Sequence, residues 1–167
     1  MANFVQKSVT KAATRVLAAP IANVTAFTEV VDDIVANNPF GCTAYQSGSE
    51  TLPAVEKTRE AYTARVVYEN GEAETVGQVT VKCPTVAAYT ANVATVLANA
   101  ALATAMGGTA AHATDTDSFS AVVRCHDPSG EVYTVTLGRE TVTVSSYSAD
   151  AILATVENWA DAVPTLA

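Results

Sequence analysis

Five short stretches of the chain alternate apolar and polar side chains, and this period of two constrains the fold more than any other feature. In Tyr62–Tyr68 and Phe119–Cys125 every second residue is aromatic, aliphatic or cysteine. Successive side chains of a strand point to opposite faces of a sheet, so the pattern predicts strands with one buried face. The other stretches are 79–83, 132–137 and 141–147, and turn sequences such as Asn70-Gly71 and Gly138-Arg139 lie between them.

Four stretches instead have apolar residues at the three- and four-residue spacing of amphipathic helices. They are 4–17, 27–35, 86–100 and 152–160. The third is rich in alanine, which lets another element approach the helix closely, and Gly107-Gly108 predicts where it stops. Residues 39–58 hold Gly, Pro, Ser and Thr and are predicted to form a surface loop.

The order of these elements predicts an α+β fold. We expect a mostly antiparallel sheet of four to five strands with helices on one face, preceded by two N-terminal helices. Residues 1–19 are predicted to form a basic amphipathic N-terminal helix, or arm, and residues 20–167 a single α+β domain. Half-repeats at 60–107 and 117–163 indicate either a duplicated ββα unit or the recurrence of hairpins and helices that any α+β chain shows.

Charge divides the chain near its start. Lys7, Lys11 and Arg15 are the only charged residues before Glu29, although the whole chain has a net charge of −8. Their spacing of four places them on one face of the predicted helix at 4–17. Such a split allows the basic start of one copy to attract the acidic body of another.

Composition favours a protein that packs against other molecules. Apolar residues make up 49% of the chain and charged residues only 16%, and much of the bulk comes from Ala, Val and Thr. A large part of the surface must then be neutral and weakly polar. Burying such a surface has a low desolvation cost, which favours an oligomer.

The reactive residues match no catalytic or cofactor motif. Cys125-His126 with Cys83 could suggest zinc, but neighbours in a strand point to opposite faces and can hardly share one ion. An acid–base site would need a carboxylate beside His112 or His126. We therefore predict no enzyme activity, no cofactor and no metal.

Two questions about sites stay open at the level of sequence. Cys83 and Cys125 could form a disulfide if they lie on neighbouring strands in an oxidising compartment. The loops at 41–56 and 108–118 could bind a ligand or an ion, since the second contains Asp115 and Asp117.

The sequence contains no continuous apolar segment typical of a secretory signal or a membrane span. Polar or charged residues interrupt every few positions through Arg15, and Asn and Thr interrupt residues 91–106. The sequence leaves the localisation open, and Leu17-Ala18-Ala19 resembles the cleavage site of a processed leader. We expect a protein that is made in the cytoplasm and incorporated into a virion or filament, with no membrane span.

Together these observations predict a non-enzymatic structural subunit that self-assembles into a homo-oligomeric shell, tube or filament, such as a virus or phage coat or tail component or a cellular filament subunit. Its partners are other copies of itself, with nucleic acid contact only through the N-terminal helix in a multimer. The alternative is a small ligand- or partner-binding α+β module. The residues expected to contact the next copy are Phe4, Val5, Lys7, Val9, Lys11, Arg15 and Val16.

Overall fold

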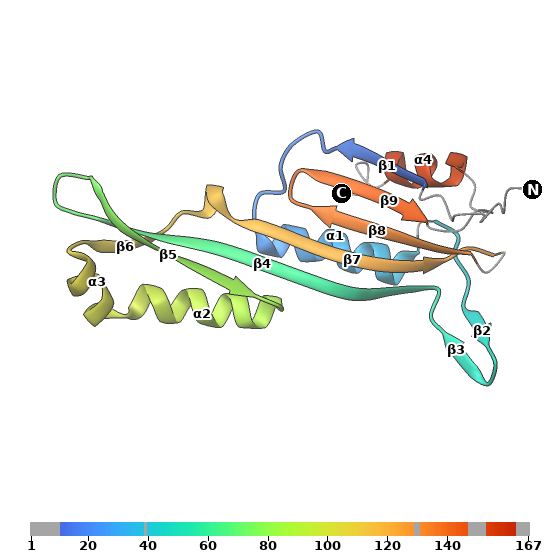
Figure 1. Cartoon of the computed structure of the whole chain (residues 1–167), viewed down its shortest axis with the longest axis horizontal. Coiled ribbons are helices and arrows are strands. Elements are labelled where there is room, and N and C mark those ends of the chain that lie inside the picture. The colour runs from blue at the N-terminus through green and yellow to red at the C-terminus, as the bar shows by residue number, and fades with distance from the viewer. Residues whose placement is uncertain (1–10, 39, 129–130, 147–152, 163–167) are drawn as a thin grey trace, which may run out of the picture. The chain divides into compact units, whose positions relative to one another are not determined.

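The computed structural model describes residues 11–38, 40–128, 131–146 and 153–162. Its main element is a seven-stranded, mostly antiparallel sheet in the order β1-β9-β8-β7-β4-β5, in which β6 also pairs with β4 (Figure 1). The strands of this sheet are β1 (Lys11–Val16), β4 (Val55–Glu69), β5 (Thr75–Cys83), β6 (Thr109–His112), β7 (Ser118–His126), β8 (Val132–Gly138) and β9 (Thr141–Ser146). A separate hairpin consists of β2 (Tyr45–Ser47) and β3 (Glu50–Leu52), and the helices are α1 (Val24–Asn37), α2 (Val86–Ala98), α3 (Ala100–Met106) and α4 (Leu153–Ala162).

The expectation of two N-terminal helices is wrong. Lys11–Val16, which was expected to end the first helix, forms β1 and pairs in antiparallel register with β9, from Lys11 opposite Ser146 to Val16 opposite Thr141. A spacing of four residues places Lys11 and Arg15 on one face of a helix, but it places them equally well on one face of a strand. The remainder of that predicted helix, residues 4–10, lies outside the described residues.

The expected sheet of four to five strands is also wrong, because the sheet has seven. Strand β6 was missed, since Thr109–His112 has no alternation of large apolar residues and becomes a strand only by pairing with Val66–Glu69 of β4. The predicted loop at 39–58 contains the β2–β3 hairpin and the start of β4, which begins at Val55 rather than near Tyr62.

The chain divides into two compact units. Unit 1 contains the described residues up to Arg59 and from Ala121 onward, and unit 2 spans Glu60–Ser120. Strands β4 and β7 each contribute one part to each unit. The predicted arm at 1–19, the domain at 20–167 and the half-repeats at 60–107 and 117–163 stay predictions.

In unit 1 the alternation of side chains determines which face of the sheet is buried. Val135 and Leu137 of β8 are fully buried, and so are Val142 and Val144 of β9, whereas their neighbours along each strand remain partly exposed. The register pairs Val135 with Val144 and Leu137 with Val142, so the four side chains lie on one face. Helices α1 and α4 add Phe27, Val31, Ile34, Val156 and Trp159 to the buried residues of this unit.

Aromatic stacking and one arginine connect the segments of unit 1. The ring of Trp159 on α4 stacks on Phe40, with centroids 4.6 Å apart, and lies 4.7 Å from the ring of Tyr133 on β8. Arg139, in the turn between β8 and β9, donates to the backbone carbonyls of Ile21 at 2.8 Å and Ala22 at 3.0 Å. These contacts hold the segment before α1 and the helix α4 to the β8–β9 hairpin.

In unit 2 the predicted hairpin is present, and β4 is paired along both of its edges. Tyr62 lies opposite Cys83 of β5, and Val66 lies opposite both Val79 of β5 and His112 of β6. The register shifts beside Gly77, so Val76 is the extra residue of a bulge. The side chains of β4 that point inward, from Tyr62 to Tyr68, are buried together with Tyr89 and Val93 of α2.

The helical segment after β5 is broken at one asparagine. The side chain of Asn99 accepts a hydrogen bond from the backbone N–H of Leu102, while its own N–H donates to the carbonyl of Val96. The residue therefore ends α2 and begins α3, and the two helices meet at 62°. Gly107, with a φ of 79°, ends α3 as the sequence predicts.

Gly108 joins α3 to β6 at a point where any side chain would meet backbone. A Cβ atom placed there would lie 2.7 Å from the carbonyl oxygen and 3.0 Å from the nitrogen of Glu69 in β4. We predict that Gly108→Ala lowers the free energy of unfolding by about 1–3 kcal/mol, as overpacking does. Urea unfolding of the full chain measures this change.

The matched control is Gly71→Ala, because a Cβ at Gly71 has no atom within 4 Å. Both substitutions restrict the unfolded chain equally, so that effect cancels in the comparison. The control should change stability by no more than about 0.5 kcal/mol. Equal stability of the two variants would contradict the close approach of β6 to Glu69.

Candidate functional site

The residues predicted to contact a neighbouring copy fall into two groups. Phe4, Val5, Lys7 and Val9 lie outside the described residues, whereas Lys11, Arg15 and Val16 belong to β1. Arg15 has a partner within its own chain, because its Nε donates to Oδ1 of Asp161 on α4 at 2.6 Å. Its Nη1 also donates to the carbonyl of Thr14 at 3.1 Å. An ion pair this exposed contributes about 0–1 kcal/mol, and a contact role for Arg15 stays a prediction.

Strand β1 forms one end of the strand order and has an open edge within the described part of the chain. The backbone N–H of Leu17 donates to the carbonyl of Glu140 at 2.8 Å. Hydrogen-bonded and non-hydrogen-bonded pairs alternate along an antiparallel ladder, so the backbone groups of Ala12, Thr14 and Val16 point away from β9. The side chain of Val16 is 75% exposed. This edge can therefore pair with a further strand.

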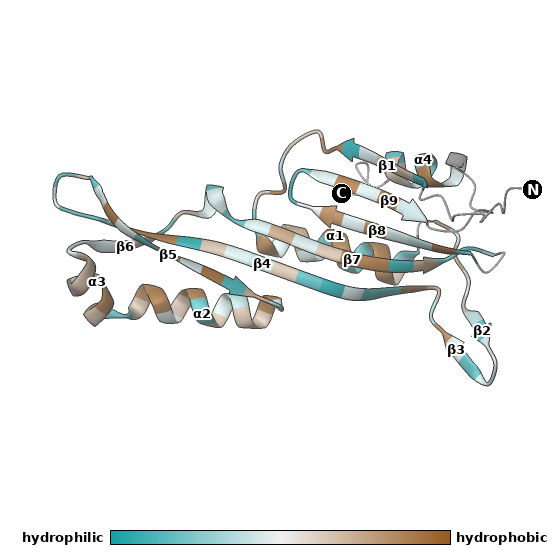
Figure 2. Cartoon of the chain, in the orientation of Figure 1, coloured by the Kyte–Doolittle hydropathy of each residue, from teal (hydrophilic) through white to brown (hydrophobic). Residues whose placement is uncertain are grey.

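The exposed side of α2 and α3, here called the neutral helical surface, carries no charge. The sequence contains no Asp, Glu, Lys or Arg from residue 84 to residue 114. Only Tyr89 and Val93 of the two helices are buried, and Leu97 is 38% exposed. Figure 2 shows apolar colouring along most of both helices, with polar colouring confined to short bands. A helix that faces water normally has charged residues on its outer side, so this surface resembles one that is covered.

A second uncharged surface lies on the outer face of the sheet in unit 1, over β1, β9 and β8. Its residues are exposed or half-buried, and they are Ala12, Thr14, Val16, Thr141, Thr143, Ser145, Val132, Thr134 and Thr136. The hydroxyl oxygens of Thr14 and Thr143 lie 2.9 Å apart across the β1–β9 pair. We call these residues the neutral sheet face.

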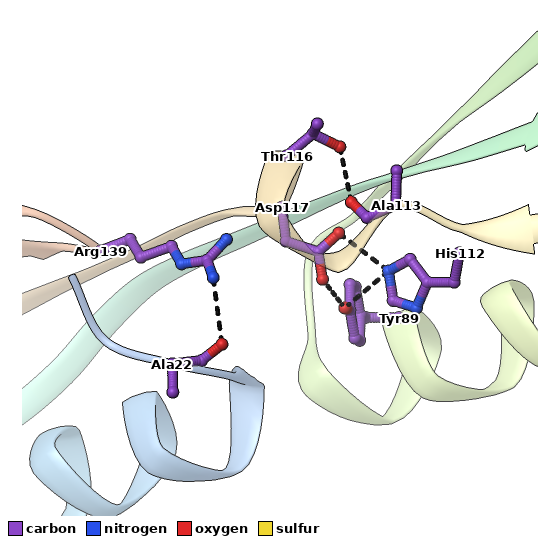
Figure 3. Close-up of polar contacts among 7 residues, drawn as sticks. All are labelled: Ala22, Tyr89, His112, Ala113, Thr116, Asp117 and Arg139. Atoms are coloured by element: carbon purple, nitrogen blue, oxygen red, sulfur yellow. Dashed lines mark hydrogen bonds and ion pairs between the residues drawn. The ribbon is translucent and has the colours of Figure 1, made fainter.

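Unit 2 contains a cluster of polar side chains built around a buried carboxylate (Figure 3). Asp117 precedes β7, and its side chain is 4% exposed. Its Oδ1 lies 2.8 Å from Nε2 of His112 at the end of β6, and its Oδ2 accepts a hydrogen bond from the hydroxyl of Tyr89 on α2. That hydroxyl also lies 3.5 Å from Nε2 of His112. Both oxygens of the carboxylate are thus engaged by side chains from two other elements.

The hydrogen bonds of this cluster connect α2, β6 and the turn before β7. The ring of Tyr89 also packs against Tyr62 and Phe119, with centroid distances of 6.1 Å to each. A carboxylate beside His112 is the arrangement that acid–base chemistry would require, but the hydroxyl nearest to the imidazole already donates to that carboxylate. The sequence contains the three residues of the cluster but offers no signal that they meet.

The second histidine is held in unit 1. His126 is buried, its Nδ1 donates to the carbonyl of Pro53 at 3.2 Å, and its ring stacks on Tyr45 of β2 at 5.3 Å. These contacts attach the β2–β3 hairpin to the end of β7. Both segments considered for ligand binding contain regular secondary structure. Residues 41–56 include the β2–β3 hairpin, and residues 108–118 include β6 and a 3₁₀ turn at Thr114–Thr116.

Among the residues that the structure describes, no three His, Cys, Asp or Glu side chains lie close enough together to hold a metal ion. No single helix in that part of the chain is long and apolar enough to cross a membrane. The bent pair of α2 and α3 meets the requirements of length and composition only when the two are taken together. Comparison of the chain with protein-family models, curated protein sequences and solved structures finds no match.

Two tyrosines of unit 2 provide a test of how much the hydrogen bonds to Asp117 contribute to stability. The hydroxyl of Tyr89 donates to the carboxylate, so Tyr89→Phe should lower the free energy of unfolding by about 1.5–3 kcal/mol. The hydroxyl of Tyr68 is buried without a hydrogen-bond partner among the described residues, so Tyr68→Phe should leave stability unchanged or raise it. Urea denaturation of both variants measures the difference. Equal destabilisation by the two substitutions would refute the role of the Tyr89 hydroxyl.

Proposed function

We propose that the protein is a structural subunit that self-assembles into a homo-oligomer, and that copies meet through the neutral helical surface. The observation that carries the proposal is the exposure of α2 and α3 without a single charged side chain. A helix that is hydrophobic all round is usually buried, either in a core or against a partner, and α2 and α3 consist mostly of Ala, Val and Leu. In the single chain only one side of α2 is buried, by Tyr89 and Val93.

Charge favours this surface over the rest of the molecule as the place of contact. With a net charge of −8, two copies repel one another wherever their acidic side chains approach. The neutral helical surface and the neutral sheet face allow approach with little repulsion and little loss of hydration. Apolar burial at about 25 cal/mol per Å² then supplies the contact energy, and a stable contact needs about 800 Å² from each copy.

The open edge of β1 offers a second way to join copies. Backbone groups of Ala12 and Val16 point away from β9, and strand addition between copies would satisfy them. Since Arg15 already binds Asp161, the basic start of the chain is not required to reach an acidic neighbour. Contact through neutral surfaces therefore replaces contact through opposite charges in this proposal.

The assembly can be tested by placing one charge on the neutral helical surface. Leu97→Glu adds a carboxylate on α2 at a residue that is 38% exposed. We expect the wild-type chain to form particles much larger than a monomer in light scattering and electron microscopy. In the variant the apparent dissociation constant should rise by about 100-fold or more, because a buried unpaired charge is costly.

The matched control is Ser49→Glu, which adds the same charge at the exposed turn between β2 and β3. It should assemble like the wild type, and circular dichroism should be the same for all three proteins. A wild-type chain that remains monomeric at high concentration would contradict the proposal and favour a ligand- or partner-binding module. Unchanged assembly of Leu97→Glu would exclude the neutral helical surface as the contact.

A further inference from the structure

Two of the three cysteines lie against each other in unit 1. Cys42 follows α1, and Cys125 is near the end of β7. The backbone N–H of Thr43 donates to the carbonyl of His126 at 3.1 Å, so the two segments run side by side. Their side chains meet as well, because the two thiols share a hydrogen bond. Both cysteines are free thiols in this structure.

The segment that carries Cys42 is held firmly in this position. The side chain of Asn38, the residue that ends α1, accepts from the backbone N–H of Cys42 at 2.9 Å and donates to its carbonyl. Cys125 is fully buried in β7, whereas Cys42 is 6% exposed. Cys42 is therefore the more accessible of the two residues.

The two thiols differ in acidity, and the difference suits them for sequential reaction. The hydrogen bond from Cys125 lowers the pKa of Cys42, against burial and the charge of Asp127, which raise it. The same hydrogen bond, together with burial, raises the pKa of Cys125. A thiolate attacks a disulfide and a thiol does not, so Cys42 is the first nucleophile.

We propose that Cys42 and Cys125 are an oxidation site that closes to an intramolecular disulfide on reaction with a small-molecule disulfide. The Cys42 thiolate attacks one sulfur of the reagent, the sulfur–sulfur bond of the reagent breaks, and one thiolate leaves. Cys125 then passes its proton to that thiolate and attacks the Cys42 sulfur, which releases the second half of the reagent as a thiolate that takes a proton from water. Two protein thiols are oxidised and one disulfide is reduced to two thiols.

Cys83 stands apart from this chemistry. Its sulfur, on β5 in unit 2, accepts a hydrogen bond from the side-chain amide of Asn92 at 3.3 Å. The neighbour of the Cys125 thiol is Cys42, so the Cys83–Cys125 pair considered from the sequence is replaced by Cys42–Cys125. The odd number of cysteines is then explained as one reactive pair and one structural thiol.

A disulfide here would connect the segment after α1 to β7 and close a long loop of chain. Cross-linking a loop of this length restricts the unfolded chain. We therefore expect oxidation to raise the melting temperature by about 8–15 °C.

The test uses the full-length protein incubated with oxidised glutathione or with dithiothreitol, followed by proteolysis and mass spectrometry without reduction. The expected result is a peptide pair linked through Cys42 and Cys125, with Cys83 still able to react with maleimide. Cys83→Ser should form the same bridge, whereas Cys42→Ser should retain two free thiols or one glutathione adduct. A bridge that includes Cys83 would overturn the proposal. So would a wild-type chain without any bridge, in which each of the three cysteines is a free thiol or carries glutathione. Because the wild-type map decides the question, the test does not depend on the folding of any variant.

Discussion

Most strands of this fold cover the core with one face of the sheet, so they bury every second side chain, and the rest of the fold is built on this alternation. In unit 1 this places Val135, Leu137, Val142 and Val144 on one face of the β8–β9 pair, where they are fully buried. In unit 2 the same alternation buries the inward side of β4 beneath Tyr89 of α2. The opposite face of the sheet is then free to vary, and on β1, β9 and β8 it carries no charge.

Alternation also explains how much of the fold could be predicted from the sequence. The strands within 62–68, 79–83, 119–125, 132–137 and 141–146 were predictable because most of their inward residues are apolar and most of their outward residues are polar. In contrast, Lys11–Val16 has only Ala13 buried, and its two basic residues fit a helix or a strand equally well. Strand β6 has no apolar alternation at all and is formed by its pairing with β4, next to the close approach of Gly108. Pairing of this kind depends on tertiary contacts that a local pattern does not contain.

The polar sites were less predictable than the fold for a similar reason. Asp117 and His112 were visible as loop residues, but the third member of their cluster, Tyr89, belongs to the inner stripe of a helix more than twenty residues earlier. Likewise, Cys42 was not linked to Cys125, because the segment after α1 has no regular pattern. Asp161 was not predicted as the partner of Arg15, because an arginine placed on a helix does not indicate a pairing with α4.

The corrected position of Arg15 changes the physical basis of the proposed assembly. The sequence suggests attraction between a basic head and an acidic body, whereas the structure pairs Arg15 with Asp161 of the same chain. What remains unexplained by the single chain is the long uncharged stretch from 84 to 114, most of which is exposed on α2 and α3. In an acidic protein such a surface is the one at which identical copies repel each other least.

In the proposed assembly, α2 and α3 are covered when copies associate. Hydrogen–deuterium exchange measured on the same protein at low and at high concentration tests it most directly, because contact slows the local opening of backbone hydrogen bonds. Peptides from residues 86–106 should exchange more slowly at high concentration, while peptides from the β2–β3 hairpin should not change. Association without slower exchange in residues 86–106 would contradict it.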